Sequence, residues 1–397
     1  MAVPAASVRV RGLRPGLNET GETSLNRPAS HLWAARWVSS GTGSQKGTNH
    51  VKLSAIAASL VCGMFVASAV TAADGEAEAE SQSADCSKLV AGPDVTVGEI
   101  LRAGCEPTTA QMSALMDNPV GNVAMWWNQI DYYGVENSKF NKSDHKTNYM
   151  GIIQWPQALS SNWNLINRVV YNVTRSPIDN DDVDDFGAAP GTLLPPSDFP
   201  DSPLDVFGGS TTGLGDTYYI GLFSPKKPVK MGSGKLVWGV GFDAGFPTAS
   251  DDVLGTEKYT AGPAALGVYL GKKWKLGSLA QHYWSYAGDD DRSDVNMTNL
   301  QYIYYYALTP TINIGAAPNI IANWEQSGDD RFSVPIGLGI NTTVNIGKVP
   351  VRFGLEFHKF VIKPDDVPGS DYGIRFFIIP AVPSALFEWM EKPLFGD

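Results

Sequence analysis

The amino-acid sequence predicts an all-β protein in which about twelve antiparallel strands form a barrel that spans a membrane. Apolar and polar residues alternate strictly over long stretches, most clearly between residues 332 and 361. The two arms of this stretch run for about 12 to 15 residues, whereas strands of soluble proteins average about 5 to 6. Short and long connectors also alternate along the chain, as turns and loops do at the two ends of a membrane barrel.

The hairpin at residues 332–361 shows this pattern residue by residue. In its first arm, 332–346, every second position carries an apolar side chain or Thr342, and the positions between carry Ser, Pro, Gly, Asn and Thr. The second arm, 349–357, repeats the alternation after a turn at Gly347. A tilted strand needs about 9 to 11 residues to cross a bilayer. We therefore expect the apolar face to meet lipid and the polar face to meet a lumen.

Composition excludes several classes of protein. A helical membrane protein would carry several apolar runs of about 20 residues, and this chain of 397 residues has one such run, near its N-terminus. The net charge of −11 argues against nucleic acid as a partner. Three cysteines are too few for a disulfide scaffold. The 41 glycines and 11% aromatic residues suit a barrel, in which half of each strand is polar.

The first 73 residues resemble a leader ahead of the folded protein. Residues 1–50 lack periodicity, whereas residues 51–73 contain a lysine, an apolar stretch and the small residues Thr71, Ala72 and Ala73, which is the pattern of a cleaved signal peptide. Because a signal peptide begins a chain, we interpret residues 1–50 as a mis-annotated or disordered extension. A genuine extension is the alternative for residues 1–50, and a transmembrane anchor is the alternative for residues 51–73.

Residues 74–121 are expected to form a periplasmic segment in front of the barrel. Their first part, 74–85, is acidic and rich in small residues, as in a disordered linker. Cys86 and Cys105 can pair in an oxidising periplasm, which stabilises the loop between them by about 3 kcal/mol in the chain-entropy model. Residues 108–116 have the pattern of a short helix, with Thr108 or Thr109 as its N-cap.

The barrel itself is predicted to occupy residues 122–383, followed by a tail at 384–397. Its twelve strand segments are 122–134, 147–157, 162–174, 213–224, 235–248, 259–271, 274–287, 295–307, 310–325, 331–346, 348–363 and 372–382. Short connectors lie at 160–162, 225–235, 271–273, 308–310 and 347–348, and longer, mostly acidic ones at 138–146, 176–212, 251–258, 288–294, 326–330 and 364–371. In outer-membrane barrels short turns are periplasmic and long loops extracellular, so an even number of strands places both termini in the periplasm.

Two further patterns concern the strands. Trp and Tyr gather near predicted strand ends, as in the aromatic girdles of membrane interfaces. Pro318, Pro335 and Pro350 fall inside predicted strands, where they indicate bulges because proline cannot donate to a ladder.

The polar faces of the strands supply the candidate functional residues. A charge on the lipid side would cost about 2 to 4 kcal/mol for Arg or Lys at the midplane, so these side chains are expected to point inward. They could line a selective pore or form a network of ion pairs that closes the barrel. The candidates are Arg168, Asp216, Asp243, Asn313, Asn319, Asn323, Glu325, Arg352, Glu356, His358 and Arg375.

Two acidic loops are candidates for binding Ca²⁺ or Mg²⁺, which could bridge the phosphates of lipopolysaccharide. They lack the spacing of an EF-hand, and a solvated run of charge is the simpler interpretation. The candidate ligands are Asp181, Asp182, Asp184 and Asp185 in the first loop and Asp289, Asp290 and Asp291 in the second.

No catalytic arrangement is evident, so we predict neither an enzyme nor a cofactor. His282 and Ser285 lie three residues apart and therefore face opposite sides of a strand. The sequence also lacks a Gly-x-Ser-x-Gly elbow, a zinc-type histidine pair and a phosphate-binding loop. His145 falls in a predicted loop.

A set of short motifs at 117–122, 162–168, 213–217, 222–225, 238–241, 246–249 and 284–296 completes the sequence evidence. Together they resemble the outer-membrane barrel family labelled "MetA-pathway of phenol degradation", whose relatives are often mislabelled neuromedin U. The resemblance covers about residues 117–380. It implies a Gram-negative outer-membrane barrel suspected of transport, and it brings no catalytic residues. Such barrels commonly end on a strand with a terminal aromatic residue, whereas this chain continues past its last strand, with Phe395 near the end.

These observations lead to two functional hypotheses. The first is a channel for passive or facilitated passage of small molecules, with hydrophobic or aromatic compounds suggested by the family label alone. The alternative is a closed structural or surface-interaction barrel whose acidic loops bind cations or lipopolysaccharide. Outer-membrane lipid and lipopolysaccharide are the expected partners in both cases.

Overall fold

The computed structural model describes residues 86–91, 95–137, 142–178, 207, 209–326, 328–364 and 368–395. The chain divides into two units, Met1–Ala79 and Glu80–Asp397, and every described residue belongs to the second. The predicted extension, signal peptide and acidic linker therefore lie outside the described residues. Among the residues that are described, no helix is long and apolar enough to cross a membrane.

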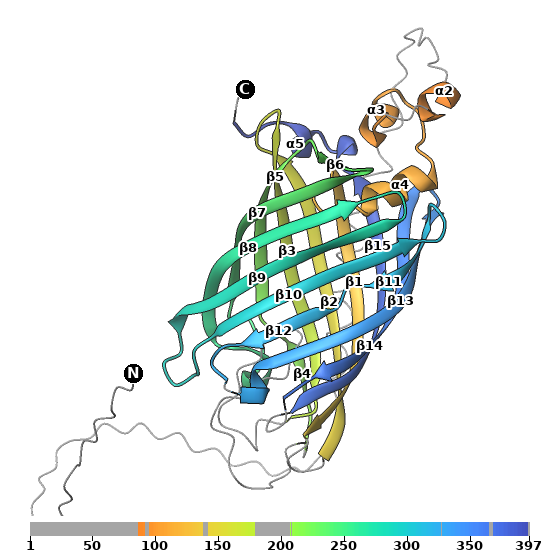
Figure 1. Ribbon diagram of the computed structural model, residues 1–397. Helices are drawn as coiled ribbons and strands as arrows, with labels where there is room; N and C mark the ends of the chain where they lie inside the picture. The colour runs from red at the N-terminus through yellow and green to blue at the C-terminus, as the bar shows by residue number, and fades with distance from the viewer. Residues whose placement is uncertain are drawn as a thin grey trace, which may run out of the picture. The chain divides into compact units, whose positions relative to one another are not determined.

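Twelve antiparallel strands close into a barrel (Figure 1). The closure is complete because β15 pairs with β1 and β9 pairs with β10. Fifteen strand segments make the twelve strands, since β4, β5 and β6 follow one another along the fourth strand and β11 and β12 along the ninth. The segments are β1 (Val123–Asn137), β2 (Lys142–Ala158), β3 (Trp163–Ser176), β4 (Thr211–Leu214), β5 (Thr217–Pro225), β6 (Val229–Met231), β7 (Gly234–Phe246), β8 (Lys258–Leu270), β9 (Trp274–Gly288), β10 (Asn296–Ala307), β11 (Ile312–Ala316), β12 (Asn319–Asn323), β13 (Phe332–Ile346), β14 (Val349–Ile362) and β15 (Gly369–Pro383).

The prediction of an antiparallel twelve-stranded barrel is confirmed, with differences in three of its strands. The fourth strand, predicted as continuous over 213–224, is interrupted between Leu214 and Thr217, and the ninth, predicted over 310–325, between Ala316 and Asn319. The ninth strand breaks where Gly315 has a φ of +139° and Pro318 has no N–H to donate. The second strand begins at Lys142 rather than 147, because its pairing with β1 extends beyond the local pattern.

The outer face of the barrel is apolar, and on β13 the inner face is polar or small, as the alternation predicts. On β13, Ile336, Leu338 and Ile340 are 51 to 64% exposed, whereas Asn341 and Thr343 on the opposite face are buried. Exposed aromatic rings lie near the strand ends, at Trp163 and Trp274 on one side and at Tyr259, Trp284, Tyr286 and Tyr372 on the other. An apolar surface between two aromatic girdles is the arrangement of a barrel immersed in a bilayer.

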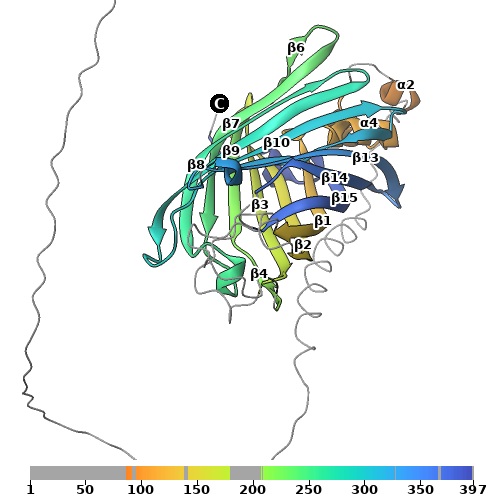
Figure 2. The same cartoon turned by 60° about the horizontal axis from the view of Figure 1, so that its bottom comes forward.

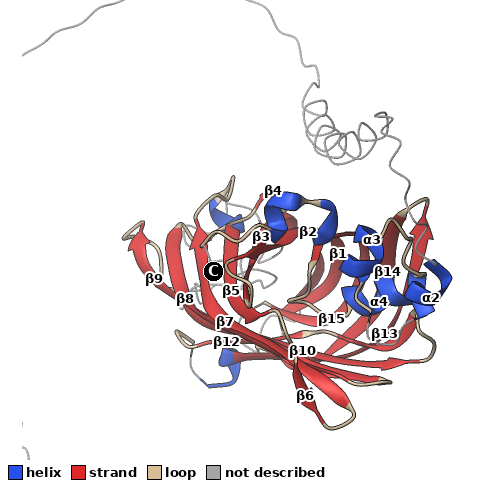
Figure 3. Ribbon diagram, turned by 90° about the horizontal axis from the view of Figure 1, so that it is seen from above, coloured by secondary structure: helices blue, strands red, loops and turns tan. Residues whose placement is uncertain are grey.

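Helices cover the end of the barrel that carries the short turns (Figures 2 and 3). They are α2 (Cys86–Ala91), α3 (Val97–Arg102) and α4 (Thr109–Met116) before the first strand, and α5 (Glu388–Glu391) after the last. The predicted helix at 108–116 is confirmed as α4. Its N-cap is Thr108, whose side chain accepts from the backbone of Gln111 in a capping box.

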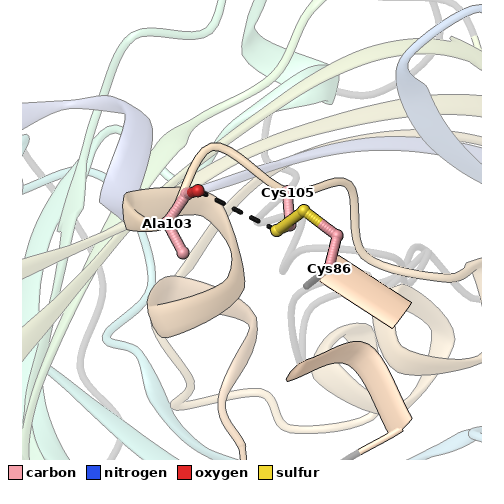
Figure 4. The surroundings of a disulfide bond; sticks show 3 residues. All are labelled: Cys86, Ala103 and Cys105. Carbon is pink, nitrogen blue, oxygen red and sulfur yellow. Dashed lines mark hydrogen bonds between the residues drawn. A yellow bond between two sulfur atoms is a disulfide. The ribbon is translucent and has the colours of Figure 1, made fainter. Parts of the chain in front are cut away.

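A disulfide joins Cys86 in α2 to Cys105 after α3 (Figure 4). The two Cα atoms lie 5.6 Å apart. The bond therefore closes the small helical segment on itself. α3 has its own capping box, in which hydrogen bonds from Thr96 lower the pKa of the exposed Glu99 carboxyl.

The C-terminal tail lies over the turn between β2 and β3. A short 3₁₀ turn, η4 (Ser384–Leu386), leads into α5. Beyond α5, the backbone N–H of Leu394 donates to the carbonyl of Ala158, and that of Phe395 donates to the carbonyl of Leu159, each at 3.1 Å. Arg102 of α3 and Glu391 of α5 form an exposed ion pair at 3.0 Å, so both ends of the described chain meet at this mouth.

Candidate functional site in the barrel interior

A row of charged side chains crosses three neighbouring strands inside the barrel. Glu356 on β14, Arg375 on β15 and Asp131 on β1 are direct register partners, so they lie side by side at one level of the wall. Arg375 Nε lies 2.8 Å from Asp131 Oδ1, and Arg375 Nη1 lies 3.8 Å from Glu356 Oε2. All three side chains are more than 90% buried. The predicted lumen residues Glu356 and Arg375 are thus brought together.

Further polar groups extend this row on both sides. His358 Nε2 lies 3.0 Å from Glu356 Oε2, and the hydroxyl of Tyr305 on β10 donates to Glu356 Oε1 at 2.5 Å. On the other side, Gln129 Nε2 donates to Asp131 Oδ2 at 2.7 Å. The carboxylates therefore have hydrogen-bond partners in addition to Arg375, which a buried charge requires.

The chain between α4 and β1 is bonded to the wall at the mouth that carries the short turns. Asp117, the C-cap residue of α4, forms ion pairs with Arg352 on β14, at 2.8 Å, and with Lys275 on β9. Arg352 Nη2 also donates to the carbonyl of Ser113 in α4 at 2.9 Å. Since β9 and β14 lie on different parts of the wall, a single carboxylate ties this segment to two sides of the mouth.

Further contacts hold the same segment inside the mouth. Gln154 Nε2 on β2 donates to the carbonyl of Pro119 at 3.0 Å, and the buried Val120 packs into the apolar cluster of the interior. Lys275 Nζ donates to Asn313 Oδ1 at 2.6 Å, and Asn313 Nδ2 donates to Asn341 at 2.9 Å. The predicted residues Arg352 and Asn313 therefore belong to the mouth rather than to the central row.

Another part of the inner wall carries an apolar cluster. Side chains from β2 to β10 and from β12 form one cluster, which includes Ile152, Ile166, Tyr218, Ile220, Leu222, Leu266, Leu279, Tyr283, Met297 and Ile321. A cavity with an empty volume of about 970 Å³, including space that opens to solvent, lies between this cluster and the charged row. Its lining includes Tyr218, Ile220 and Leu279 on the apolar side and His358 and Arg375 on the charged side.

Two predicted lumen residues are buried without an opposite charge close by. The guanidinium of Arg168 on β3 lies 5.8 Å from the ring of Trp127 and borders the cavity. Asp243 on β7 is fully buried, and neither of its carboxylate oxygens has a hydrogen-bond partner among the described residues. Isolated buried charges are costly, so these two side chains carry an uncompensated cost of burial among the described residues.

The remaining candidates lie nearer the long-loop end. Asp216, in the break between β4 and β5, accepts from the backbone and side chain of Thr256, each at 2.8 Å. Asn319 donates to Asn299 at 2.8 Å and borders the cavity. Asn323 is half-buried at the end of β12. Glu325 is exposed in the following turn, which corrects its placement in the lining, because the strand stops two residues earlier than predicted.

The acidic loops show no metal site within the described part of the chain. Asp289, Asp290 and Asp291 are exposed, and no group of three or more His, Cys, Asp or Glu side chains in the described ranges could hold a metal ion. Asp181, Asp182, Asp184 and Asp185 lie outside the described residues.

His282 and Ser285 have separate partners. His282 Nδ1 lies 2.8 Å from the hydroxyl of Thr298, and the centroid of its ring lies 4.0 Å from that of Trp284, with the two ring planes tilted by 50°. The hydroxyl of Ser285 instead donates to Asp294 at 3.0 Å. This arrangement gives no nucleophile–base pair.

Several site residues were missed by sequence reasoning. Asp131 and Tyr305 lie at inward positions of predicted strands, and Lys275 does so beside a basic turn, so the period-2 pattern could have identified all three. Asp117 precedes the barrel, and no local pattern indicates that its carboxylate enters the mouth.

Comparisons with known proteins find matches among solved structures. No protein-family model and no curated protein matches the sequence. Among solved structures, an outer-membrane channel from Pseudomonas putida F1 matches with a TM-score of 0.45 and 15% identity over 66% of this chain and 94% of that chain. Outer-membrane phospholipase A from Escherichia coli matches with a TM-score of 0.32 and 9% identity over 68% of this chain and 97% of that chain. A FadL homologue from Pseudomonas aeruginosa matches with a TM-score of 0.29 and 9% identity over 68% of this chain and 92% of that chain.

Proposed function

We propose that this chain is a bacterial outer-membrane channel that allows passive or facilitated passage of a small molecule. The observation that carries the proposal is a cavity inside a closed barrel that opens to solvent and is bordered by an apolar cluster and a charged row. A barrel whose only role were structural could fill its interior with side chains, as narrow barrels do. The apolar outer face between aromatic girdles supports the membrane location.

The two kinds of wall favour a solute with an apolar body and one polar group. Ligand pockets combine apolar walls with a few placed polar groups, which fix orientation. The apolar cluster offers Tyr218, Ile220 and Leu279, and the charged row offers Arg375 and His358 as hydrogen-bond partners. Hydrophobic or aromatic compounds, which the family resemblance implies, have such a body. The alternative remains a closed barrel that acts through its acidic loops.

Single-channel conductance tests the proposal. Protein purified from outer membranes and placed in a planar bilayer should give discrete, reproducible current steps. A silent bilayer, with protein that is still folded by its heat-modifiable migration, would contradict the channel and favour the closed structural barrel.

The charged row should set ion selectivity if the lumen conducts. Replacing Glu356 with glutamine removes one negative charge from the row while keeping its size, so the cation-to-anion permeability ratio should fall. Reversal potentials in asymmetric salt measure this ratio. Glu325→Gln is the matched control, because this exposed carboxylate lies in a turn, and it should leave the ratio unchanged.

A further inference from the structure

Two polar side chains on the inner face of the wall, away from the charged row, have no hydrogen-bond partner in the described part of the chain. Asp243 on β7 is 0% exposed and Thr260 on β8 is 2% exposed. Both oxygens of the Asp243 carboxylate and the hydroxyl of Thr260 lack a partner there. The carboxylates of Asp131 and Glu356, by contrast, both have Arg375 beside them. An unpartnered buried carboxylate is costly, so Asp243 needs a further explanation.

The pairing of β7 with β8 places Asp243 and Thr260 together (Figure 1). Asp243 lies opposite Gly262, and Thr260 lies opposite Gly245, so the two polar residues are diagonal neighbours on one face of the sheet. A Cβ built on Gly262 would lie 3.5 Å from Asp243 Oδ1, and one built on Gly245 would clash with the Thr260 hydroxyl. Each polar side chain therefore leans over the glycine of the neighbouring strand, and their three oxygens lie over the seam between β7 and β8.

Two tyrosine rings cover this seam. Tyr218 on β5 and Tyr283 on β9 are separated by β7 and β8 in the sheet, yet their ring centroids lie 5.5 Å apart with the planes at 76°. The rings meet by reaching across the two strands between them. Both tyrosines line the cavity, whereas Asp243 and Thr260 do not. The ring pair therefore separates the three oxygens from the cavity.

Arg168 is the basic side chain at the same level of the wall, and it does not neutralise Asp243. Arg168 pairs in register with Ile220, which in turn pairs with Asp243, so two strand spacings of about 10 Å separate the two backbones. The guanidinium lies 5.8 Å from the ring of Trp127 instead. No described side chain donates to the Asp243 carboxylate, so a compensating charge has to come from a ligand or a proton.

A primary ammonium group matches the chemistry of this place. It has three N–H donors and no acceptor, and the two oxygens of Asp243 with the hydroxyl of Thr260 offer three acceptors. Aromatic rings such as those of Tyr218 and Tyr283 attract organic cations. A calcium ion would need six to eight oxygen ligands, and no group of three or more His, Cys, Asp or Glu side chains in the described ranges could hold a metal ion.

We propose that Asp243 and Thr260 bind the primary ammonium group of a small amine whose apolar body lies in the adjoining cavity. The proposal rests on the proposed function and deepens it, because it assigns the polar group of the solute. Ile220, the register partner of Asp243, lines the cavity, so an apolar wall begins directly beside the ammonium site. Tyr218 and Tyr283 part to admit the ammonium group, since an edge-on pair of rings is a weak contact.

Titration calorimetry of the full chain in a non-ionic detergent at pH 7 tests the site. The probes are benzylammonium and benzyl alcohol, which has the same ring and no charge. Benzylammonium should bind at least about tenfold more tightly, as hydrogen bonds to a charged group allow. Asp243→Asn keeps the size of the side chain and should abolish this preference. Glu325→Gln, which changes an exposed carboxylate in a turn, is the matched control and should keep it.

Two results of this titration would overturn the site. One is a wild-type protein that does not prefer benzylammonium, as expected if Asp243 holds a proton instead. The other is an Asp243→Asn variant that keeps the preference. The urea midpoint of the variant, read from its heat-modifiable band, should be no lower than that of the wild type, because the substitution removes an uncompensated buried charge. A much lower midpoint would assign Asp243 a structural role and contradict the proposal.

The hydrogen bonds are tested separately from the charge. Benzyltrimethylammonium carries the charge without an N–H donor, and Thr260→Val keeps the shape of the side chain without its hydroxyl. Each change should weaken binding severalfold relative to benzylammonium and the wild-type chain. Equal binding of the two cations would overturn the assignment to a primary amine.

The planar bilayer distinguishes the ammonium site from the proposed function. If the bilayer is silent while calorimetry shows a preference for benzylammonium that depends on Asp243, the channel fails and the site stands. If the bilayer conducts while calorimetry shows no such preference, the channel stands and the ammonium site fails.

Discussion

At the scale of single residues, Arg375 holds the charged row together. It is the only basic side chain in contact with both Asp131 and Glu356 among the described residues, and it also bonds the backbone at Ala317. Buried ion pairs contribute little net stability, yet removal of one partner is costly because it leaves charges buried and unpaired. The stability of the barrel is therefore sensitive to the loss of Arg375, the central cation of the row.

We expect Arg375→Met to destabilise the barrel by about 3 to 5 kcal/mol, because Asp131 and Glu356 would then lose their shared cation. The measurement is the urea midpoint of the heat-modifiable band of the purified protein. Lys359→Met is the control, since the Lys359 side chain is 59% exposed in its pair with Asp371 and such pairs contribute about 1 kcal/mol or less. Equal midpoints for the two variants would contradict the role of Arg375.

At the scale of elements, the segment from α4 to β1 determines whether the short-turn mouth is open. Its tie to the wall depends on Asp117, which is paired with two cations. We expect Asp117→Asn to raise the open probability of the channel, because Lys275 and Arg352 would then repel each other beside a neutral amide. Single-channel recording measures the change. Glu106→Gln is the control, since this exposed carboxylate pairs with the exposed Lys348. An unchanged open probability in Asp117→Asn would contradict the role of this segment in closing the mouth.

We expect the disulfide to stabilise the helical segment before the barrel and not the barrel itself. Cys86→Ser with Cys105→Ser removes a link that closes a loop of about 19 residues and is worth about 3 kcal/mol in the chain-entropy model. Limited proteolysis between α2 and α4 should therefore become faster, while the urea midpoint of the barrel stays that of the wild type. A lower barrel midpoint would show that the disulfide also supports the strands.

The twelve strands and α4 could be predicted because their signals are local. Period-2 alternation fixes which face of a strand is inward, and Thr108 with Gln111 fixes the start of α4. The triad of Asp131, Glu356 and Arg375 could not be assembled in the same way, since it depends on the register of three strands that are far apart in sequence. The interruption of the ninth strand was visible only as Pro318, whose effect depends on the charged side chains beneath it.

At the scale of the whole molecule, both ends of the described chain lie at the short-turn mouth. α3 and α5 meet there through Arg102 and Glu391, and the tail bonds the backbone of Ala158 and Leu159. In outer-membrane barrels short turns face the periplasm, which also suits a disulfide that needs an oxidising compartment. The asymmetry of the barrel therefore leads to a prediction of its orientation.

We expect the mouth with the helices to face the periplasm and the long loops to face outward. An epitope inserted between Asp290 and Asp291, in the exposed loop after β9, should be accessible to antibody on intact cells. An epitope after Asp397 should become accessible only when the outer membrane is permeabilised. Staining of the C-terminal epitope alone on intact cells would reverse the orientation. It would also place Asp117 and the mouth it closes at the outer surface, where a solute would meet the closed end first.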